Sequence, residues 1–177
     1  MAWSTPLTAV SNATLTAVQW NASVRDNLLT TAPALATTSG SHFAATGANA
    51  IAERRCSTNT VSTSQTTTST SYANLATVGP SVTATTGTLA LTWATVQAAN
   101  STTDANTYWS VDISSATTTA ASDNWGGQWE ANADQDLRWT ATALHTLTAG
   151  SNAFTVKYRV DSNTGTFSKR DLVVMPL

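Results

Sequence analysis

A strict alternation of apolar and polar residues near the C-terminal end most constrains the fold of this chain. The alternating residues are Phe154, Thr155, Val156, Lys157, Tyr158, Arg159 and Val160. A period of two is the pattern of a β-strand with one buried and one wet face, and such strands belong to antiparallel sheets. Residues 137–147 show a similar pattern, and turn signals at residues 148–152 predict a hairpin. The alternation therefore predicts an antiparallel sheet whose apolar face, within residues 154–160, lies in a core.

Further strand-like segments follow one another from residue 61 to the C-terminus. They lie about 8–12 residues apart and are separated by turn signals, with no helical periodicity among them. The residues predicted to face the core in two of these strands are Leu89, Leu91, Trp93, Trp109, Val111 and Ile113. This spacing is typical of a β-sandwich or jelly roll. We therefore predict a mainly β domain of about eight antiparallel strands over residues 61–177.

Residues 1–33 are predicted to form an extended arm followed by one amphipathic helix. Thr16 and Gln19 have the spacing of a capping box, and the helix is expected to end near Thr30. The candidate docking residues are Trp3 in the arm and, on one face of the helix, Ala17, Trp20, Val24 and Leu28. A helix of about four turns cannot bury such a stripe alone. The stripe is therefore expected to pack on the sheet domain, on a partner protein or on copies of itself, for example in a three-fold bundle.

Residues 34–60 are predicted to be an extended linker. They contain mostly small residues, with two glycines and little hydrophobic periodicity. Residues 61–71 are rich in serine and threonine. Because threonine favours an extended backbone, we predict a first edge strand there.

The composition argues against two classes of partner. The chain has only 8 basic and 10 acidic residues, with a formal net charge of −2, whereas a nucleic-acid-binding protein is expected to carry a basic stripe. No apolar run approaches the length of about 20 residues that crosses a bilayer, and residues 1–10 lack the pattern of a signal peptide. Cys56 is the only cysteine, so no internal disulfide is possible. We expect no nucleic-acid partner and no membrane partner.

The sequence offers few candidates for catalysis or metal binding. His42 and His145 are the only histidines, and the strand pattern predicts that His145 faces solvent or a neighbouring subunit. No serine lies in the Gly-x-Ser-x-Gly turn of hydrolases. Residues 132–136 alternate oxygen-bearing side chains as in a calcium loop, but they lack its central glycine and closing glutamate. We therefore predict no catalytic residue, no metal site and no cofactor.

Three tryptophans and two basic residues of the strand domain are its candidate contact residues. Trp125, Trp129 and Trp139 lie near acidic and amide side chains, the combination that carbohydrate recognition uses. Tryptophan is also a common anchor of cores and subunit interfaces, and we favour that interpretation here. Lys157 and Arg159 are two of only eight basic residues, so they are candidates for specific partner contacts.

Several short sequence motifs occur in an order that is typical of one protein family. They are Trp3-Ser4-Thr5-Pro6, Thr16-Ala17, Asn21 and Arg25-Asp26-Asn27-Leu28, followed by residues 45–52. In this order they resemble the N-terminal part of virion proteins from tailed bacteriophages that infect actinobacteria. Residues 147–152 and the strand around Tyr158 are similar to small β-sandwich domains carried by such proteins. The chain departs from the family pattern at Leu7 and at Ser11-Asn12, where the family tends to have Arg and a Gly-Glu pair.

The resemblance implies a structural role without catalysis. Family members are tail fibres, minor tail proteins or capsid decorations, and they are often trimeric. It implies that residues 1–33 dock the chain to other virion proteins and that a trimeric sandwich projects from the particle. Capsid decoration on the outer head surface is the alternative, and a carbohydrate-binding module that contacts host-surface glycan is a third possibility. On this interpretation the protein is made in the bacterial host cytoplasm and works in the virion.

Overall fold

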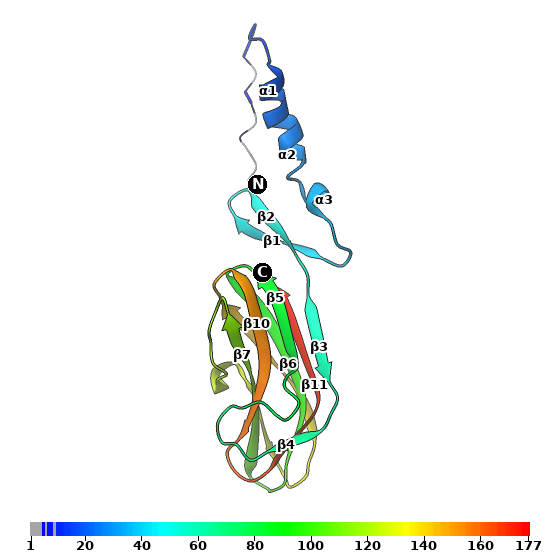
Figure 1. Ribbon diagram of the computed structural model, residues 1–177, viewed down its shortest axis with the longest axis vertical. Coiled ribbons are helices and arrows are strands. Elements are labelled where there is room, and N and C mark those ends of the chain that lie inside the picture. Colours follow the sequence, from blue (N-terminus) through cyan, green and yellow to red (C-terminus); the bar gives the residue numbers. More distant parts are fainter. Residues whose placement is uncertain (1–4, 6, 9) are drawn as a thin grey trace. The chain divides into compact units, whose positions relative to one another are not determined.

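The computed structural model describes residue 5, residues 7–8 and residues 10–177, and the chain forms two compact units. The first unit is Met1–Arg55 and the second is Cys56–Leu177 (Figure 1). The protein is mainly β and its sheets are antiparallel, which confirms the predicted fold class. Among the described residues, no helix is long and apolar enough to cross a membrane.

The first unit contains a short helical segment that begins where the sequence predicts. Gln19 N donates to Thr16 Oγ1 at 3.3 Å, and Thr16 N donates to Gln19 Oε1 at 3.0 Å, so the predicted capping box is present. The helical elements are α1 (Ala17–Trp20), a π-helical turn (Asn21–Arg25), α2 (Asp26–Leu28) and α3 (Ala32–Leu35). The segment that begins with α1 thus ends at Leu28, close to the predicted position.

The π-helical turn changes the face that the predicted stripe presents. Its hydrogen bonds span five residues instead of four, so it breaks the 3.6-residue period on which the stripe depends. Val24 is half-buried, whereas Ala17, Trp20 and Leu28 are exposed. The buried side chain of α2 is the polar Asn27, which donates from Nδ2 to Ser23 O at 3.1 Å. The segment therefore differs from a regular amphipathic α-helix with one continuous stripe.

Residues 34–60, predicted to be a linker, contain a β-hairpin and the first strand of the second unit. β1 (His42–Gly47) pairs antiparallel with β2 (Ala50–Arg54). Asn49 at the turn has a left-handed backbone with φ 56°, a conformation that asparagine tolerates better than most residues. Backbone pairing, rather than large apolar residues, builds this hairpin, so hydrophobic periodicity does not reveal it.

One carboxylate fastens the segment before β1 to the hairpin. Glu53 on β2 accepts hydrogen bonds from the Ser41 hydroxyl at 2.5 Å, from Thr37 N at 3.0 Å and from Thr38 N at 2.8 Å. The Ser41 bond, with those from Thr37 and Thr38, lowers the pKa of Glu53 to about 2. The carboxylate therefore stays charged, and keeps accepting these hydrogen bonds, over most of the acidic range.

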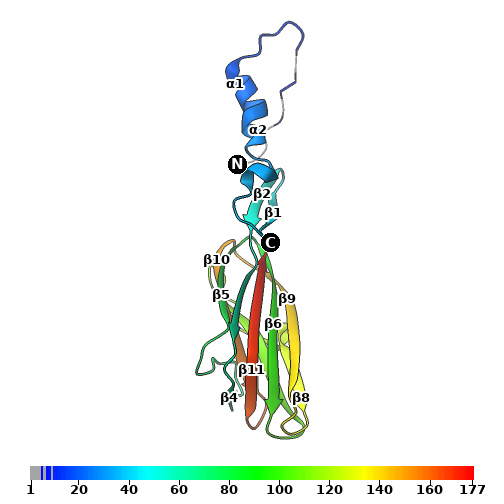
Figure 2. The same ribbon diagram turned by 90° about the vertical axis from the view of Figure 1, so that its right-hand side faces the viewer.

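The second unit consists of two antiparallel sheets packed around one core, the arrangement of a β-sandwich (Figures 1 and 2). The four-stranded sheet has the order β5 (Ser81–Thr86), β10 (Gly150–Val160), β7 (Ala105–Ser115) and β8 (Gly127–Ala131). The five-stranded sheet has the order β3 (Ser57–Val61), β11 (Gly165–Pro176), β6 (Leu89–Asn100) and β9 (Leu137–Thr146), with β4 (Gln65–Thr67) also paired to β11. A 3-10 turn, η2 (Asp123–Trp125), follows β7 along the chain.

The predicted hairpin within residues 137–160 does not form, because its two strands belong to different sheets. β9 pairs with β6, whereas β10 pairs with β7 and β5. The buried Asn152 holds the crossing between the sheets. Its Nδ2 donates to Thr148 O at 3.0 Å and to Thr86 Oγ1 at 2.9 Å, and its Oδ1 accepts from Thr117 N at 2.8 Å. The alternation thus predicts both strands, but the turn signal predicts the wrong partners for them.

The core contains the predicted apolar face of β10. Phe154, Val156, Tyr158 and Val160 are all fully buried, which confirms the prediction made from their alternation. Trp109, Val111 and Ile113 on β7 are buried beside them, as predicted. Both sheets contribute to the same apolar cluster, so the core extends between the layers.

The face of β6 that packs against the core is opposite to the predicted one. The buried residues of this strand include Ala90, Thr92, Ala94, Val96 and Ala98, whereas Leu89, Leu91 and Trp93 are half-buried on the outer face. The reason is the size of Trp109, which is fully buried and donates from Nε1 to Ala94 O at 3.1 Å. Small residues on β6 leave the space that this indole fills. Gly127 on β8 also leaves room for the indole, because an added Cβ would lie 2.3 Å from the Trp109 ring.

His145 is buried between the sheets, contrary to the prediction that it faces solvent or a subunit neighbour. Its Nε2 lies 2.9 Å from Thr92 Oγ1, and its ring stands edge-on to Trp125 with the ring centroids 6.1 Å apart. Burial lowers the pKa of His145, which keeps the ring neutral near pH 7. The histidine is therefore part of the packing of the sandwich.

Arg170 on β11 is a fully buried charge that orders the loops around it. A β-bulge between Ser168 and Asp171, with Lys169 at φ 44°, inserts one extra residue into β11 next to Arg170. The guanidinium donates to four acceptors at 3.1 to 3.3 Å: Thr63 O, Gln65 Oε1, Thr77 O and Gly79 O. Because these acceptors lie on segments before β5, the single side chain ties residues 63–79 to the core.

Replacement of Arg170 by methionine is expected to lower the free energy of unfolding by about 3 kcal/mol or more, because several carbonyl oxygens then lose their buried donor. Urea unfolding followed by tryptophan fluorescence measures the change. Arg138→Met is the matched control, since the Arg138 side chain is 51% exposed and its removal is expected to cost less than about 1 kcal/mol. Equal effects of the two substitutions would contradict the role assigned to Arg170.

Candidate functional site

The first unit presents large apolar side chains to solvent on and beside its helical segment. Val18 is 77% exposed, Trp20 54%, Leu28 59% and Leu29 55%. Because of these exposed fractions, Trp20 and Leu28, two of the predicted docking residues, are available to a partner. Ala17 is exposed as well and Val24 is half-buried, whereas Trp3 lies outside the described residues.

A cavity of about 320 Å³ lies between the arm and the helical segment of the first unit. Its apolar lining residues include Leu7, Val10, Leu15, Trp20 and Val24. Leu7 N donates to Ser23 Oγ at 3.1 Å, which ties the arm to the helical segment beside the cavity. The stripe residues Trp20 and Val24 therefore line a recess, while Leu28 lies on the exposed surface.

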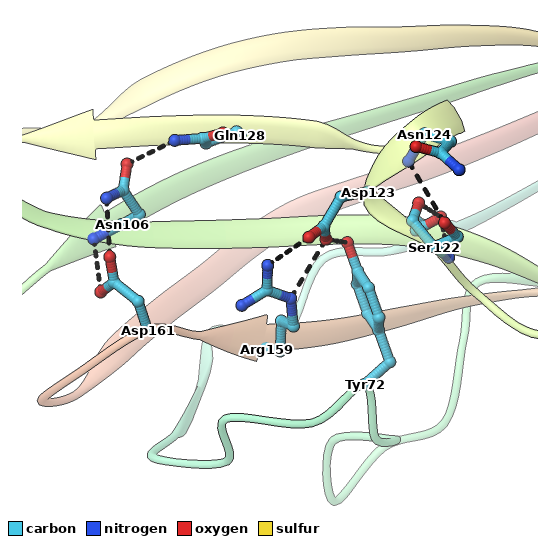
Figure 3. Close-up of polar contacts among 9 residues, drawn as sticks. Tyr72, Asn106, Ser122, Asp123, Asn124, Gln128, Arg159 and Asp161 are labelled. Atoms are coloured by element: carbon cyan, nitrogen blue, oxygen red, sulfur yellow. Dashed lines mark hydrogen bonds and ion pairs between the residues drawn. The ribbon is translucent and has the colours of Figure 1, made fainter.

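On the second unit, a polar cluster surrounds Arg159 on the outer face of the four-stranded sheet (Figure 3). Arg159 on β10 donates from Nε to Asp123 Oδ1 at 3.1 Å and from Nη2 to Asp123 Oδ2 at 2.5 Å. The Tyr72 hydroxyl donates to the same carboxylate at 2.7 Å. The guanidinium also lies over the ring of Tyr108, with its carbon 3.6 Å from the ring centroid. We call Tyr72, Tyr108, Asp123 and Arg159 the Arg159 cluster.

The electrostatics of the Arg159 cluster keep its ion pair formed at neutral pH. Hydrogen bonding from Arg159 lowers the pKa of Asp123, and hydrogen bonding from Tyr72 acts in the same direction. Burial, together with the nearby Asp123 carboxylate, raises the pKa of Tyr72. Tyr72 therefore stays protonated and remains a donor. The arrangement fastens the η2 turn and the segment around Tyr72 onto the sheet.

Neighbouring polar groups on this face are paired in the same way. Asn106 donates from its backbone N and its Nδ2 to the Asp161 carboxylate at 2.8 and 2.6 Å, and Gln128 donates to Asn106 Oδ1 at 2.7 Å (Figure 3). Lys157 Nζ lies 3.1 Å from Asp112 Oδ2. Lys157 and Arg159, predicted as partner contacts, are therefore both engaged in ion pairs within the chain.

The three predicted contact tryptophans do not form one exposed aromatic platform. Trp125 and Trp129 are half-buried, and their indole N–H groups donate to Val111 O at 3.1 Å and to Gln135 O at 3.4 Å. Trp129 also packs against the core cluster. Trp139 on β9 is 57% exposed. Of the three, Trp139 is thus the one whose side chain is open to a partner.

The described residues contain no group of three or more His, Cys, Asp or Glu side chains placed to hold a metal ion. The loop considered for calcium is instead pinned to its surroundings, since Asp134 N donates to Asn100 O at 2.8 Å. The polar groups of the second unit hold loops by hydrogen bonds and ion pairs. The exposed groups with the greatest capacity for binding are apolar.

No protein-family model matches this chain, and no curated protein matches it.

Sequence reasoning missed Tyr72, Tyr108 and the partner of Arg159. Tyr108 pairs with Arg159 across β7 and β10, and this pairing follows only from the strand register. Asp123 lies two residues before Trp125 in the sequence and was considered only for the disfavoured sugar site, whereas the structure pairs it with Arg159. Correct assignment of the β7–β10 pair would have been the signal, because cross-strand neighbours share a face.

The ion pair of the Arg159 cluster is expected to give a stability contribution that depends on pH. Because the folded pKa of Asp123 lies below its unfolded value, the contribution is complete above the unfolded pKa of about 4 and is lost as the pH falls through the folded pKa. Asp123→Asn should lower the free energy of unfolding by no more than about 1 kcal/mol at pH 7, since the carboxylate is partly screened by solvent.

Urea unfolding of wild type and Asp123→Asn at pH 7 and near pH 2 measures this dependence, and the difference between them should shrink at the lower pH. Asp104→Asn serves as control, because Asp104 is an exposed loop residue outside the cluster. A difference of the same size at both pH values would show that the charge of Asp123 is not its cause.

Proposed function

We propose that this chain is a non-enzymatic structural protein of a tailed-phage virion, of the minor tail or fibre type, which docks to the particle through its first unit. The observation that carries the proposal is the exposure of Val18, Trp20, Leu28 and Leu29 around one short helical segment. Large apolar side chains that stay exposed within one short segment suit a site of protein–protein contact. Other virion proteins of the tail or capsid are the proposed partners.

The residues that carry the family resemblance support this assignment, because they build the exposed segment. Thr16 supplies its N-terminal cap, and Asn27 is buried where the segment ends. Thr30 Oγ1 donates to Asn27 O at 2.8 Å and closes that end. The Arg25-Asp26-Asn27-Leu28 phrase thus forms a defined helix end that leaves Leu28 exposed.

The second unit suits a projecting role in the proposed protein. It has one continuous apolar core, and three ion pairs join its surface charges within the chain. A rigid sandwich of this kind is a spacer or platform that needs no ligand to fold. The proposed assembly is a homotrimer, as the resemblance implies. Glycan contact has no exposed tryptophan platform to support it, so we do not propose it as the function.

Substitution of both Trp20 and Leu28 by serine is expected to lower the number of copies per phage particle at least tenfold, because the docking surface loses two of its largest exposed apolar groups. Quantitative mass spectrometry of purified particles measures the copy number. Val78→Ser is the matched control, since Val78 is similarly exposed on the second unit. Unchanged incorporation of the double variant would overturn the docking role, provided that circular dichroism shows the sandwich intact.

Electron microscopy of particles carrying a tag on the C-terminus is expected to place the label on the tail. The tail location is expected because the proposal assigns the chain to the minor tail or fibre type. A uniform layer of label over the head would instead assign the chain to capsid decoration. Absence of label from all particles would remove both assignments.

A further inference from the structure

The outer face of the five-stranded sheet carries a contiguous group of large apolar side chains. The strand register places Met175 beside Leu91, and Leu91 beside Leu144, in one row across β11, β6 and β9. Val173 and Trp93 are paired in the next row. We call this group the apolar face, and its members are Leu89, Leu91, Trp93, Leu144, Val173 and Met175. The three strands that carry it lie side by side in Figure 2.

The two outer faces of the sandwich differ in character. On the four-stranded sheet, the outward side chains include Lys157 and Arg159, and both are ion-paired. On the five-stranded sheet, Leu144 at the margin of the apolar face is 60% exposed. Antiparallel sheets that face water on one side normally carry polar residues there. The apolar face therefore indicates a surface that is covered in the working assembly.

The strand at the margin of this face is also an open edge. β9 is the last strand in the order of its sheet, and within the described part of the chain no segment pairs with its outer side. Leu147 N donates to Thr88 O, and in that register the even-numbered residues of β9 direct their N–H and C=O groups away from β6. The strand contains neither lysine nor proline, which commonly protect natural edges.

We propose that the apolar face and the β9 edge together form the surface through which copies of this chain associate. Three strands about 4.8 Å apart, over about five residues of 3.3 Å each, span roughly 250 Å², just under the roughly 300–600 Å² of the largest apolar patch on a typical soluble monomer, a patch that is often functional. A standard interface buries about 800 Å² per partner. The apolar face would then form its centre, and threonines of the same sheet, among them Thr58, Thr140 and Thr142, would form its rim.

A second copy is the occupant that fits this surface, because the open β9 edge can pair with a strand of another copy and the face carries no net charge. The charged residues nearest to the apolar face on its three strands are Asp171 and Arg138, which pair with each other. The face therefore has no net charge, so two copies meet without repulsion, whereas an acidic or basic partner would find no complementary charge. The inference rests on the proposed trimer for the number of copies, whereas the surface itself is assigned from the apolar face and the β9 edge alone.

Substitution Leu144→Asp in the full chain tests the assignment, because Leu144 is exposed and its replacement leaves the core untouched. Analytical ultracentrifugation over a range of concentrations is expected to show an oligomer for the wild type and at least a hundredfold weaker association for the variant. Val78→Asp is the matched control, since it adds the same charge at a similarly exposed valine outside the apolar face. A wild type that is monomeric at all concentrations, or a Leu144→Asp chain that associates normally, would overturn the inference.

Cross-linking locates the interface independently of stability. In a Cys56→Ser background, Thr142→Cys beside Trp93 is expected to form a covalent dimer with a short bismaleimide, whereas Ser151→Cys on the four-stranded sheet is not. Equal cross-linking at both positions would contradict the assignment. Because both experiments report on association in solution, they can succeed or fail separately from the docking of the first unit to a particle.

Discussion

The second unit depends on one buried cation, beside which the described residues place no buried carboxylate. Arg170 is fully buried, and carbonyl and amide oxygens of a single chain segment replace the water around its guanidinium. Removing a charge from water is costly, and the four hydrogen bonds made by the two Nη groups offset that cost. The segment that provides these acceptors has Leu75 as its buried apolar anchor, so it would have little reason to fold without them. Arg170 and residues 63–79 therefore order each other.

Tyr158 connects the loop that Arg170 holds to β10, the strand with the clearest sequence pattern. Its hydroxyl donates to Gly79 O at 2.9 Å, which is also an acceptor for Arg170. Its backbone N donates to Ala73 O at 3.0 Å, so the loop is held by side chain and main chain alike. The phenol and the guanidinium thus share one carbonyl oxygen, and Arg170 also holds the Ser/Thr-rich tract through Thr63 O and Gln65 Oε1.

Local pattern predicted the strands of this fold well and their partners poorly. The alternation of residues 154–160 identified a strand and its buried face, because a period of two is a property of the backbone itself. The hairpin that joined it to β9 was wrong, since Asn152 sends the chain into the other sheet. The face of β6 was wrong too, because the volume of Trp109 decides which side of β6 packs inward. Such decisions depend on contacts between residues far apart in the sequence.

The candidate surfaces were predictable to different degrees for the same reason. The capping box and the exposure of Trp20 and Leu28 are local properties, whereas the π-helical turn that redistributes the stripe was not foreseen. Lys157 and Arg159 drew attention as rare charges, but their partners Asp112 and Asp123 lie on other segments and neutralise them.

The polar and the apolar side chains of this chain therefore make different kinds of contact. Three ion pairs join segments within the second unit, and large apolar groups stay exposed on the helical segment and on the outer face of the five-stranded sheet. Contacts made by apolar burial are not weakened by screening, whereas contacts between exposed charges are. An assembly held through these two surfaces would keep its contacts in salt, and that property suits a structural protein exposed to changing surroundings.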